Sequence, residues 1–317
     1  MADERVPGPV LHGVRTEGGG VLKIYLDCDT GVDDALALAF LLASPDVEIV
    51  GIGTVNGNTS AVQAARNTLG LLALSGISGI PVAVGEGSYR GGAAGVHGGN
   101  GIGGVTLPCG DAPDARTAVA LLTDVIRDNP GELHIIATGP CTNLAQALRT
   151  APDLPTLIAS VTVMGGAVRA PGNVTPHAEA NFRDDPRSAA AVLAAPWPVT
   201  LVPLDVTMRH RWTVPDQEAL RAGGTPLHEA LADMLPVYFE SYQPRLGVRE
   251  IPLHDPLAAA VAVGVLAPSD APQLPLRVDP EGAVREDPSA ASAVRVVLAL
   301  AEPGAPVILR RILGFRS

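Results

Sequence analysis

Short apolar runs alternate with longer segments of helical periodicity from residue 21 to about residue 204. The first run, residues 21–27, ends in Asp27 and leads into a helical segment at residues 33–43. This alternation predicts right-handed βαβ units and a mostly parallel sheet. The other strands predicted in this part of the chain are residues 47–55, 81–84, 133–137, 161–164 and 199–204. The other helices predicted there are residues 61–74, 116–128, 142–149 and 186–194.

The pattern changes after residue 205. Helical periodicity now dominates, and two late apolar runs predict strands that either extend the sheet in antiparallel fashion or form a small cap. The helices are predicted at residues 215–222, 226–243 and 255–264, and the strands at residues 293–300 and 306–313. We therefore expect an α/β fold, a doubly wound, Rossmann-like open sheet flanked by helices, with extra C-terminal helices and strands.

The chain offers no linker long enough to separate two domains, so we expect one domain over residues 21–317. Residues 1–20 are polar, contain proline and end in three glycines, which is typical of a flexible leader.

Net charge and cysteine content disfavour two classes of protein, nucleic-acid binders and disulfide-stabilised secreted proteins. Lys+Arg 22 against Asp+Glu 33 give a net charge of −11, which disfavours a protein that neutralises nucleic-acid phosphates. The three cysteines are too scattered for a disulfide framework, so we expect a cytoplasmic protein. The apolar runs are far shorter than the roughly 20 residues that a bilayer requires, so we expect no membrane association.

Four carboxylates follow the first predicted strand within eight residues: Asp27, Asp29, Asp33 and Asp34. Two carboxylates about 4 Å apart repel each other by about 4 kcal/mol at an effective dielectric constant near 20. Such a group needs protonation, separation or a cation, and a hard divalent ion such as Ca²⁺ or Mg²⁺ takes oxygen ligands. The alternative is that Asp33 and Asp34 only favour a helix N-terminus while the others face water.

Polar residues also follow several other predicted strands. They are found at residues 56–58, 138–143 and 164–166. Since ligands of open α/β sheets bind outside the carboxyl ends of the strands, these segments predict a common site at that edge.

Several motifs, in this order and spacing, resemble those of the nucleoside hydrolase family, of the inosine–uridine-preferring kind. The matching positions are Asp27 to Ala35, Asn56, Val96-His97-Gly98 with Gly101, Ala137 to Ala145, Val163 to Gly166, Gly172-Asn173, Glu179 to Asn181 and His254 to Ala258. They extend through most of the chain.

The resemblance implies a Ca²⁺ ion bound by the side chains of Asp29, Asp34 and Asp255 and by the backbone carbonyl of Thr138. It implies that Asp33 accepts a hydrogen bond from a ribose hydroxyl. The remaining residues that it places around the sugar are Asn56, Met164, Asn173, Glu179 and Asn181. It also implies a small-molecule ribonucleoside substrate and a homodimer or homotetramer.

The implied reaction is hydrolysis of the N-glycosidic bond of a ribonucleoside, giving free base and ribose in nucleoside salvage or catabolism. Asp29 would accept the proton of a water in the calcium shell, acting as general base. His254, beside the implied ligand Asp255, is the candidate that protonates the leaving base. His97 is a second candidate, in a Gly-rich segment at residues 85–104 that could form a flap over the pocket.

Tyr238 and Tyr242 are four residues apart on a predicted helix, so their side chains share one face. Both core packing and contact with the base fit that spacing. The residues leave purine and pyrimidine bases equally open.

Two other functions compete with hydrolysis. An apolar strand followed by Asp27-x-Asp29 is similar to the start of haloacid dehalogenase-type phosphatases, but Gly31 stands where that family has Thr or Val, and the single lysine, Lys23, lies upstream. The second alternative is a nucleoside- or ribose-binding protein of the same fold that has lost catalysis. No residue of the sequence positively supports it.

Overall fold

The computed structural model describes residues 20–85, 87, 90, 95–290 and 292–316 of the 317-residue chain. The predicted leader, residues 1–20, lies outside the described residues except for Gly20. The strands are β1 Leu22–Cys28, β2 Val47–Thr54, β3 Val82–Val84, β4 Leu133–Ala137, β5 Ser160–Met164, β6 Val199–Val202, β7 Arg211–Thr213, β8 Glu250–Pro252, β9 Pro268–Asp270, β10 Gln273–Val278, β11 Val284–Glu286, β12 Ala293–Val296 and β13 Ala299–Leu300.

The helices are α1 Val32–Leu42, α2 Ala61–Leu74, α3 Ala118–Asp128, α4 Thr142–Thr150, α5 Ala180–Asp184, α6 Pro186–Ala194, α7 Leu204–Thr207, α8 Val214–Arg221, α9 Pro226–Leu246, α10 His254–Ala262 and α11 Gly304–Leu313. A 3₁₀ turn, Leu154–Leu157, precedes β5.

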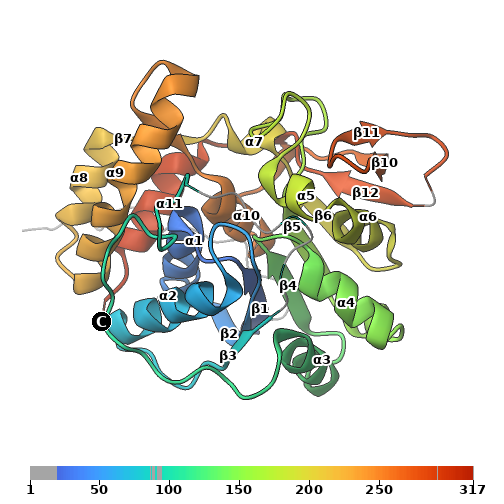
Figure 1. Ribbon diagram of the computed structural model, residues 1–317, viewed down its shortest axis with the longest axis horizontal. Coiled ribbons are helices and arrows are strands. Elements are labelled where there is room, and N and C mark those ends of the chain that lie inside the picture. The colour runs from blue at the N-terminus through green and yellow to red at the C-terminus, as the bar shows by residue number, and fades with distance from the viewer. Residues whose placement is uncertain (1–19, 86, 88–89, 91–94, 291, 317) are drawn as a thin grey trace, which may run out of the picture.

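In the part of the chain that the structure describes, one large sheet has the strand order β11-β10-β12-β6-β5-β4-β1-β2-β3 (Figure 1). All pairs from β12 to β3 are parallel, and β10 pairs antiparallel with both β12 and β11. The prediction of a mostly parallel, doubly wound α/β sheet is confirmed. The C-terminal strands extend the sheet at one edge, but β12, the part of the predicted strand 293–300 that joins it, pairs in parallel with β6. The antiparallel part of the extension is formed by β10 and β11, which the sequence pattern did not predict.

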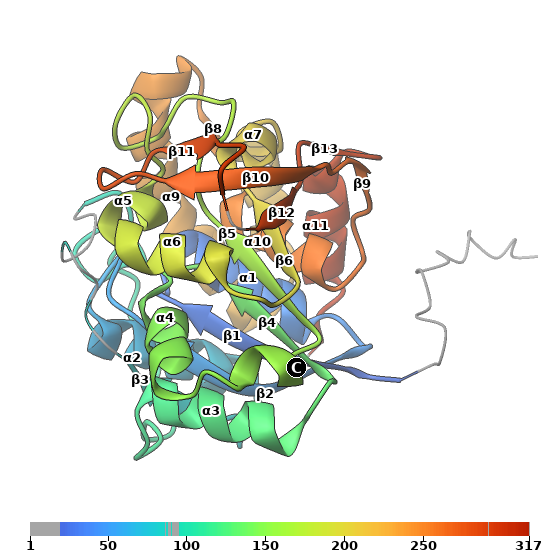
Figure 2. The same cartoon turned by 90° about the vertical axis from the view of Figure 1, so that its right-hand side faces the viewer.

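Helices cover both faces of the sheet and make two separate cores (Figure 2). One core joins α1, α2, α9, α10 and α11, with side chains such as Phe40, Leu235 and Ile308. The other lies beneath α3, α4 and α6 and includes Leu121 and Trp197. Burial of this apolar surface on both sides explains why the central strands carry almost continuous apolar runs.

Helix α1 packs against the sheet at β2 and against helices α9, α10 and α11. All of its residues from Val32 to Leu41 are buried, which accounts for its lack of a polar face. Its first turn holds Asp33 and Asp34, and the Asp34 carboxylate accepts a hydrogen bond from the Gly31 backbone N–H at 2.8 Å. The helix therefore carries acidic groups from the carboxyl end of β1 into the interior.

One predicted strand is wrong: residues 306–313 form helix α11. Ile308 and Ile312, four residues apart, are buried against the core, while Arg310 is exposed. An apolar run this short fits either structure, and here the spacing of four decides for a helix. The predicted strand at residues 293–300 divides into β12 and β13, which lie in different sheets. The predicted strand at 199–204 ends at Val202, because α7 begins at Leu204.

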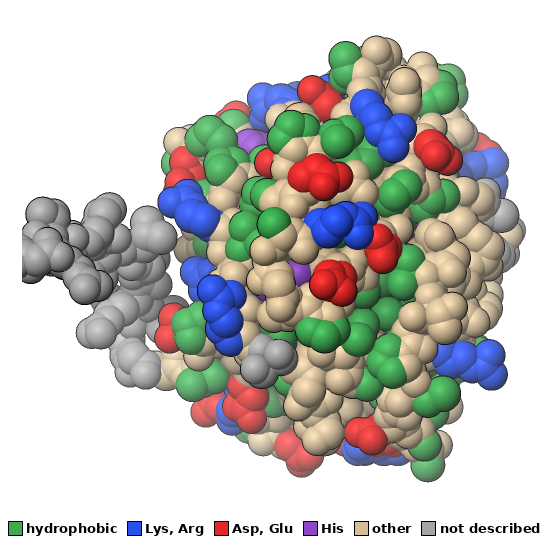
Figure 3. Space-filling view, turned by 90° about the vertical axis from the view of Figure 1, so that its left-hand side faces the viewer, with side chains coloured by type: hydrophobic (Ala, Val, Ile, Leu, Met, Phe, Trp, Pro, Cys, Tyr) green, Lys and Arg blue, Asp and Glu red, His purple; other side chains and the backbone are tan. Residues whose placement is uncertain are grey.

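The surface agrees with the charge balance of the sequence. On the face drawn in Figure 3, basic and acidic side chains are interspersed among apolar ones, with no continuous basic area. No helix among the described residues combines the length and the apolar character needed to cross a membrane.

Candidate active site

A cavity of about 180 Å³ opens beside the carboxyl ends of the central strands. Its walls come from the start of α1, the segments after β2, β4 and β5, helix α9 and the start of α10. The predicted site residues that line it are Asp33, His97, Thr138, Met164, Asn173, Glu179, Asn181, Tyr238, Tyr242, His254 and Asp255. Residues from nearly the whole length of the chain therefore meet at the sheet edge that the sequence predicts.

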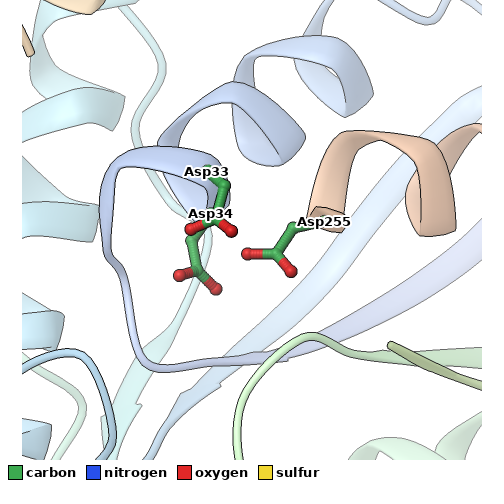
Figure 4. Close-up of side chains that lie close together, drawn as sticks. All are labelled: Asp33, Asp34 and Asp255. Carbon is green, nitrogen blue, oxygen red and sulfur yellow. The ribbon is translucent and has the colours of Figure 1, made fainter. Parts of the chain in front are cut away.

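Three carboxylates approach one another at the bottom of this cavity, and two of them, Asp33 and Asp255, line it. One oxygen from each of Asp33, Asp34 and Asp255 lies within 4.8 Å of the other two, and all three residues are buried. Figure 4 shows the carboxylates of Asp33 and Asp34, from the start of α1, facing that of Asp255 at the start of α10. The Thr138 hydroxyl donates to Asp34 at 2.7 Å, which links the loop after β4 to the same group.

Asp29 lies beside this cluster and is oriented by the loop after β2. Asn58 donates to it twice, from its backbone N–H at 2.6 Å and from its side-chain amide at 3.1 Å. The same amide is 3.2 Å from Asp34, so it joins the two carboxylates. A Cβ on Gly57 would lie 1.8 Å from an Asp29 oxygen, so only glycine allows this close approach.

The acidic groups destabilise one another's charged forms. Burial raises the pKa of Asp255 well above its usual value, and repulsion from Asp33, Asp34 and Asp29 adds to the effect. Burial followed by repulsion from Asp34 raises the pKa of Asp29 in the same way. Oxygen Oδ1 of Asp33 is buried without a hydrogen-bond partner.

These features fit a metal ion. Several buried carboxylates with an unpartnered oxygen are costly without a neutralising partner, and a cation at their centre would supply it. The donor set consists of oxygen atoms, which hard divalent cations prefer. The cluster could therefore bind a metal ion.

The wall opposite α1 carries amide and carboxylate groups on the segment before and within α5. Glu179 caps this helix, accepting hydrogen bonds from the backbone N–H groups of Asn181 at 2.9 Å and Phe182 at 3.1 Å. The Asn181 amide donates to the carbonyls of Thr138 at 2.7 Å and Met164 at 3.2 Å. This wall presents the hydrogen-bonding groups that a polyhydroxylated ligand needs.

Aromatic and histidine side chains form the remaining wall. The Tyr238 hydroxyl donates to Asp33 at 3.0 Å, and its ring packs on His97 with centroids 4.9 Å apart. The Nδ1 atom of His97 accepts the Val32 backbone N–H at 3.0 Å, so this ring is tied to the start of α1. Burial lowers the pKa of His97 to about 4.

His254 is held from both sides. Its Nδ1 atom lies 2.8 Å from the Thr207 hydroxyl and its Nε2 atom 2.7 Å from the Tyr242 hydroxyl. Burial lowers the pKa of His254 to about 3, with smaller contributions from His97 and Arg245. The imidazole is therefore one link in a chain of hydrogen bonds that reaches the cavity.

Comparison with known proteins decides the family. Residues 24–303 match the family model for inosine-uridine preferring nucleoside hydrolases. The chain belongs to the nucleoside hydrolase family. It is 37% identical over 252 residues to the pyrimidine-specific ribonucleoside hydrolase RihA of Citrobacter koseri, covering 75% of this chain and 78% of that protein.

Solved structures of nucleoside hydrolases have the same fold. The purine-preferring ribonucleoside hydrolase from Gardnerella vaginalis is 33% identical, with a TM-score of 0.85 over 92% of this chain and 98% of that one. A plant nucleoside hydrolase, the PpNRh1 enzyme, is 29% identical, with a TM-score of 0.87 over 93% and 99%. This nucleoside hydrolase is therefore an enzyme, a ribonucleoside hydrolase of the N-glycosidase class, and the phosphatase alternative is set aside.

Sequence reasoning passed over some residues of this nucleoside hydrolase site. Asn58 lines the cavity and Asn56 is absent from its described lining; the Asn56 side chain instead accepts the Ala61 backbone N–H at 2.7 Å, at the start of α2. Asn58 belongs to the same polar segment, residues 56–58, but the family motif contains Asn56 and not Asn58. Arg245 and Thr207 also contact the site, and neither stands in a motif that could have revealed it.

Proposed function

We propose that this chain hydrolyses the N-glycosidic bond of ribonucleosides in a Ca²⁺-dependent reaction, gives free base and ribose, and serves nucleoside salvage or catabolism in the cytoplasm. The observation that carries this proposal is the meeting of buried carboxylates from the start of α1 and from α10 at the bottom of a cavity with polar walls. The alternative of a binding protein without catalysis has no support, because the residues proposed for catalysis are all present in or beside the cavity: Asp29, Asp34, Asp255 and His254.

The side chains of Asp29, Asp34 and Asp255 and the backbone carbonyl of Thr138 would hold the ion. When bound, Ca²⁺ supplies Lewis-acid activation of water and neutralises the carboxylates. Asp33 belongs to the same cluster, and its oxygen Oδ1 has no hydrogen-bond partner. That oxygen is free to accept a hydrogen bond from a ribose hydroxyl.

Asp29 acts as the general base. Its carboxylate is buried and fixed by the two hydrogen bonds from Asn58, so it keeps one orientation. A water attacking the anomeric carbon from this side gives its proton to Asp29. We assign the cavity-facing position of this loop to Asn58 rather than to Asn56.

The sugar is oriented by the opposite wall and stabilised by the floor. Asn173, Glu179 and Asn181 offer donors and acceptors to its hydroxyls, and Met164 lines the same side. The transition state resembles an oxocarbenium ion, as in glycoside hydrolysis generally, so the carboxylates beneath it stabilise the positive charge of the ring.

The leaving base departs on the side of α9 and α10. His254 is neutral, because burial lowers its pKa to about 3, and it assists the departing base by donating an N–H hydrogen bond. Tyr242, 2.7 Å from its Nε2 atom, connects the imidazole to the cavity. Tyr238 has a different role, because its hydroxyl donates a hydrogen bond to Asp33 and orients that carboxylate. His97, tied to Val32 and packed on Tyr238, supports the same carboxylate.

A substrate panel tests the proposal. Inosine, adenosine, guanosine, uridine and cytidine are incubated with the enzyme and Ca²⁺, with and without a chelator, and free base and ribose are measured. We expect turnover that the chelator abolishes and added Ca²⁺ restores. Relatives named pyrimidine-specific and purine-preferring are both similar to this chain, so the same panel assigns the base preference. Binding without turnover of any substrate would contradict the proposal.

We also propose a homodimer or homotetramer, as the family resemblance implies. Light scattering coupled to size-exclusion chromatography measures the mass directly, and a monomer would contradict this part of the proposal.

A further inference from the structure

The turn between β10 and β11, residues 279–283, is stiffened by its own hydrogen bonds. The Asp279 carboxylate accepts the backbone N–H groups of Glu281 at 2.8 Å and Ala283 at 3.0 Å. The Asp279 backbone N–H donates to the Ala283 carbonyl at 2.9 Å. Gly282 has a φ of +86°, in the left-handed region that favours glycine. The turn therefore has one preferred shape.

This turn lies directly against α5, although more than 90 residues separate them in sequence (Figures 1 and 2). A Cβ on Gly282 would lie 2.6 Å from the Cα of Arg183 and 2.6 Å from the carbonyl oxygen of Phe182. Both are backbone atoms, so a side chain at position 282 could be accommodated only by moving α5 or the turn. Helix α5 carries Asn181 and follows Glu179, and both residues line the cavity.

A second contact joins the turn to the loop that carries Asn173. Ala283 and Ala178 pair as an isolated antiparallel bridge. The Ala178 carbonyl accepts the Asn173 backbone N–H at 3.2 Å, and the Asn173 side chain accepts the Ala180 N–H at 2.9 Å. The bridge residue Ala178 therefore closes the loop that carries Asn173, and it directly precedes Glu179 in the chain.

A third contact is an ion pair at the surface. The Glu281 carboxylate accepts a hydrogen bond from the Arg183 guanidinium at 2.5 Å. The Glu281 side chain is 69% exposed, so this pair adds only a weak tie between the turn and the end of α5. It offers a mild way to loosen the contact without disturbing the core.

We propose that the β10–β11 turn is a positioning element of the sugar site, with Gly282 and Ala283 fixing the wall formed by Asn173, Glu179 and Asn181. The proposal rests on the sugar-binding role given to that wall above. None of the turn residues touches the substrate. They act through α5 and the loop before it, so their loss should weaken binding of the sugar more than it changes the step that breaks the bond.

The main test compares Gly282→Ala with Gly131→Ala. Gly131 has a φ of +76° and lies between α3 and β4, and a Cβ at this position would meet no neighbouring atom within 4 Å. In both variants alanine must adopt a positive φ, so both have the same backbone strain. Only the Cβ at position 282 also overlaps neighbouring atoms. With the best ribonucleoside of the panel, we expect Gly282→Ala to raise KM at least ten-fold with a smaller change in kcat. Gly131→Ala should keep KM within two-fold. Equal KM values for the two variants would overturn the proposal.

A milder pair decides the matter if Gly282→Ala fails to fold. Glu281→Gln removes the charge that pairs with Arg183 and Arg90, and Glu132→Gln removes the similarly exposed partner of Lys23, 2.8 Å away at the amino ends of β1 and β4. We expect a two- to four-fold rise in KM for the first variant and none for the second; equal values would overturn the proposal. If the wild-type enzyme releases no base from any ribonucleoside, the proposed function fails. If it does so and the paired variants behave alike, the positioning role alone fails.

Discussion

Asp29 depends on its hydrogen-bond donors for its orientation. Both of its oxygens accept from Asn58, and an amide at position 29 would turn an NH₂ group toward one of these donors. We expect Asp29→Asn to lower kcat by about 10²–10⁴-fold, the usual effect of losing a general base, while the variant still folds and unfolds in one cooperative transition. Steady-state kinetics and a melting curve measure the two. Asp46→Asn, at an exposed carboxylate before β2, is the control, and a near-wild-type rate for Asp29→Asn would contradict the general-base assignment.

His254 should matter in proportion to how badly the leaving group needs a proton. Inosine releases a poor leaving group, whereas p-nitrophenol leaves p-nitrophenyl riboside without protonation. We therefore expect His254→Ala to lower kcat/KM much more for inosine than for p-nitrophenyl riboside. His134→Ala, at the half-buried histidine beside Ser160 on β4, is the control and should lower neither. Equal losses on both substrates for His254→Ala would argue against proton donation.

The sequence predicts the acidic part of the site well but leaves most of its contacts open. Asp29, Asp33 and Asp34 stand in one segment after a strand, so local pattern suffices to bring them together. The hydrogen bond from Tyr238 to Asp33 joins residues 205 positions apart, and helical spacing alone could not choose between core packing and the site. In the structure Tyr238 has both roles: its side chain is 1% exposed and packs in the core, and its hydroxyl still contacts the Asp33 carboxylate of the site.

The one-turn helix α7 connects two parts of the site through Asp205 and Thr207. The Asp205 carboxylate accepts three consecutive backbone N–H groups, of Val168 at 2.9 Å, Arg169 at 2.7 Å and Ala170 at 3.1 Å. These follow β5 and Met164, while Thr207 holds His254. The helix thus fixes the loop after β5 and the imidazole relative to each other.

Asp205→Ala should therefore affect both stability and activity. Leaving these N–H groups without their acceptor costs on the order of 1–3 kcal/mol of unfolding free energy, measurable by urea denaturation. We also expect a lower kcat/KM, because the loop after Met164 loses its anchor. Asp216→Ala is the matched control, since that carboxylate accepts the Thr213 N–H at 2.7 Å at the start of α8. It should lower stability alone; if Asp205→Ala does the same, α7 has no part in the site.

At the scale of elements, periodicity predicted the helices more reliably than the late strands. The predicted helix at 61–74 agrees with α2, whose Ser60 side chain accepts the Gln63 N–H at its start. The hairpin of β10 and β11 was not predicted, because only Leu274 and Leu276 alternate around Pro275, too short a pattern to indicate a strand. Helix α11 was predicted as a strand for a similar reason: a short apolar run fits the periodicity of a helix and that of a strand equally well.

At the scale of the molecule, the proposed ion would join the first strand and helix of the fold to helix α10, more than 200 residues later in the chain. Asp29 and Asp34 belong to the β1–α1 junction, whereas Asp255 begins α10, and α1 and α10 pack against each other. Without a cation, folding must bring their buried carboxylates together against mutual repulsion, so the apo protein should be less stable than the loaded one. A ligand that binds only the folded state adds about 2.7 kcal/mol at a concentration of 100 times its Kd.

We therefore expect the Tm measured by calorimetry to fall when the enzyme is treated with a chelator and to rise again with the concentration of added Ca²⁺. The activity should recover over the same range of Ca²⁺, because one site governs both. Asp255→Asn should remove most of the Ca²⁺-dependent rise in Tm, whereas Asp46→Asn should retain it. A Tm that is the same with chelator and with Ca²⁺ would show that these carboxylates hold no calcium ion, and the β1–α1 junction and α10 would then be joined by packing alone.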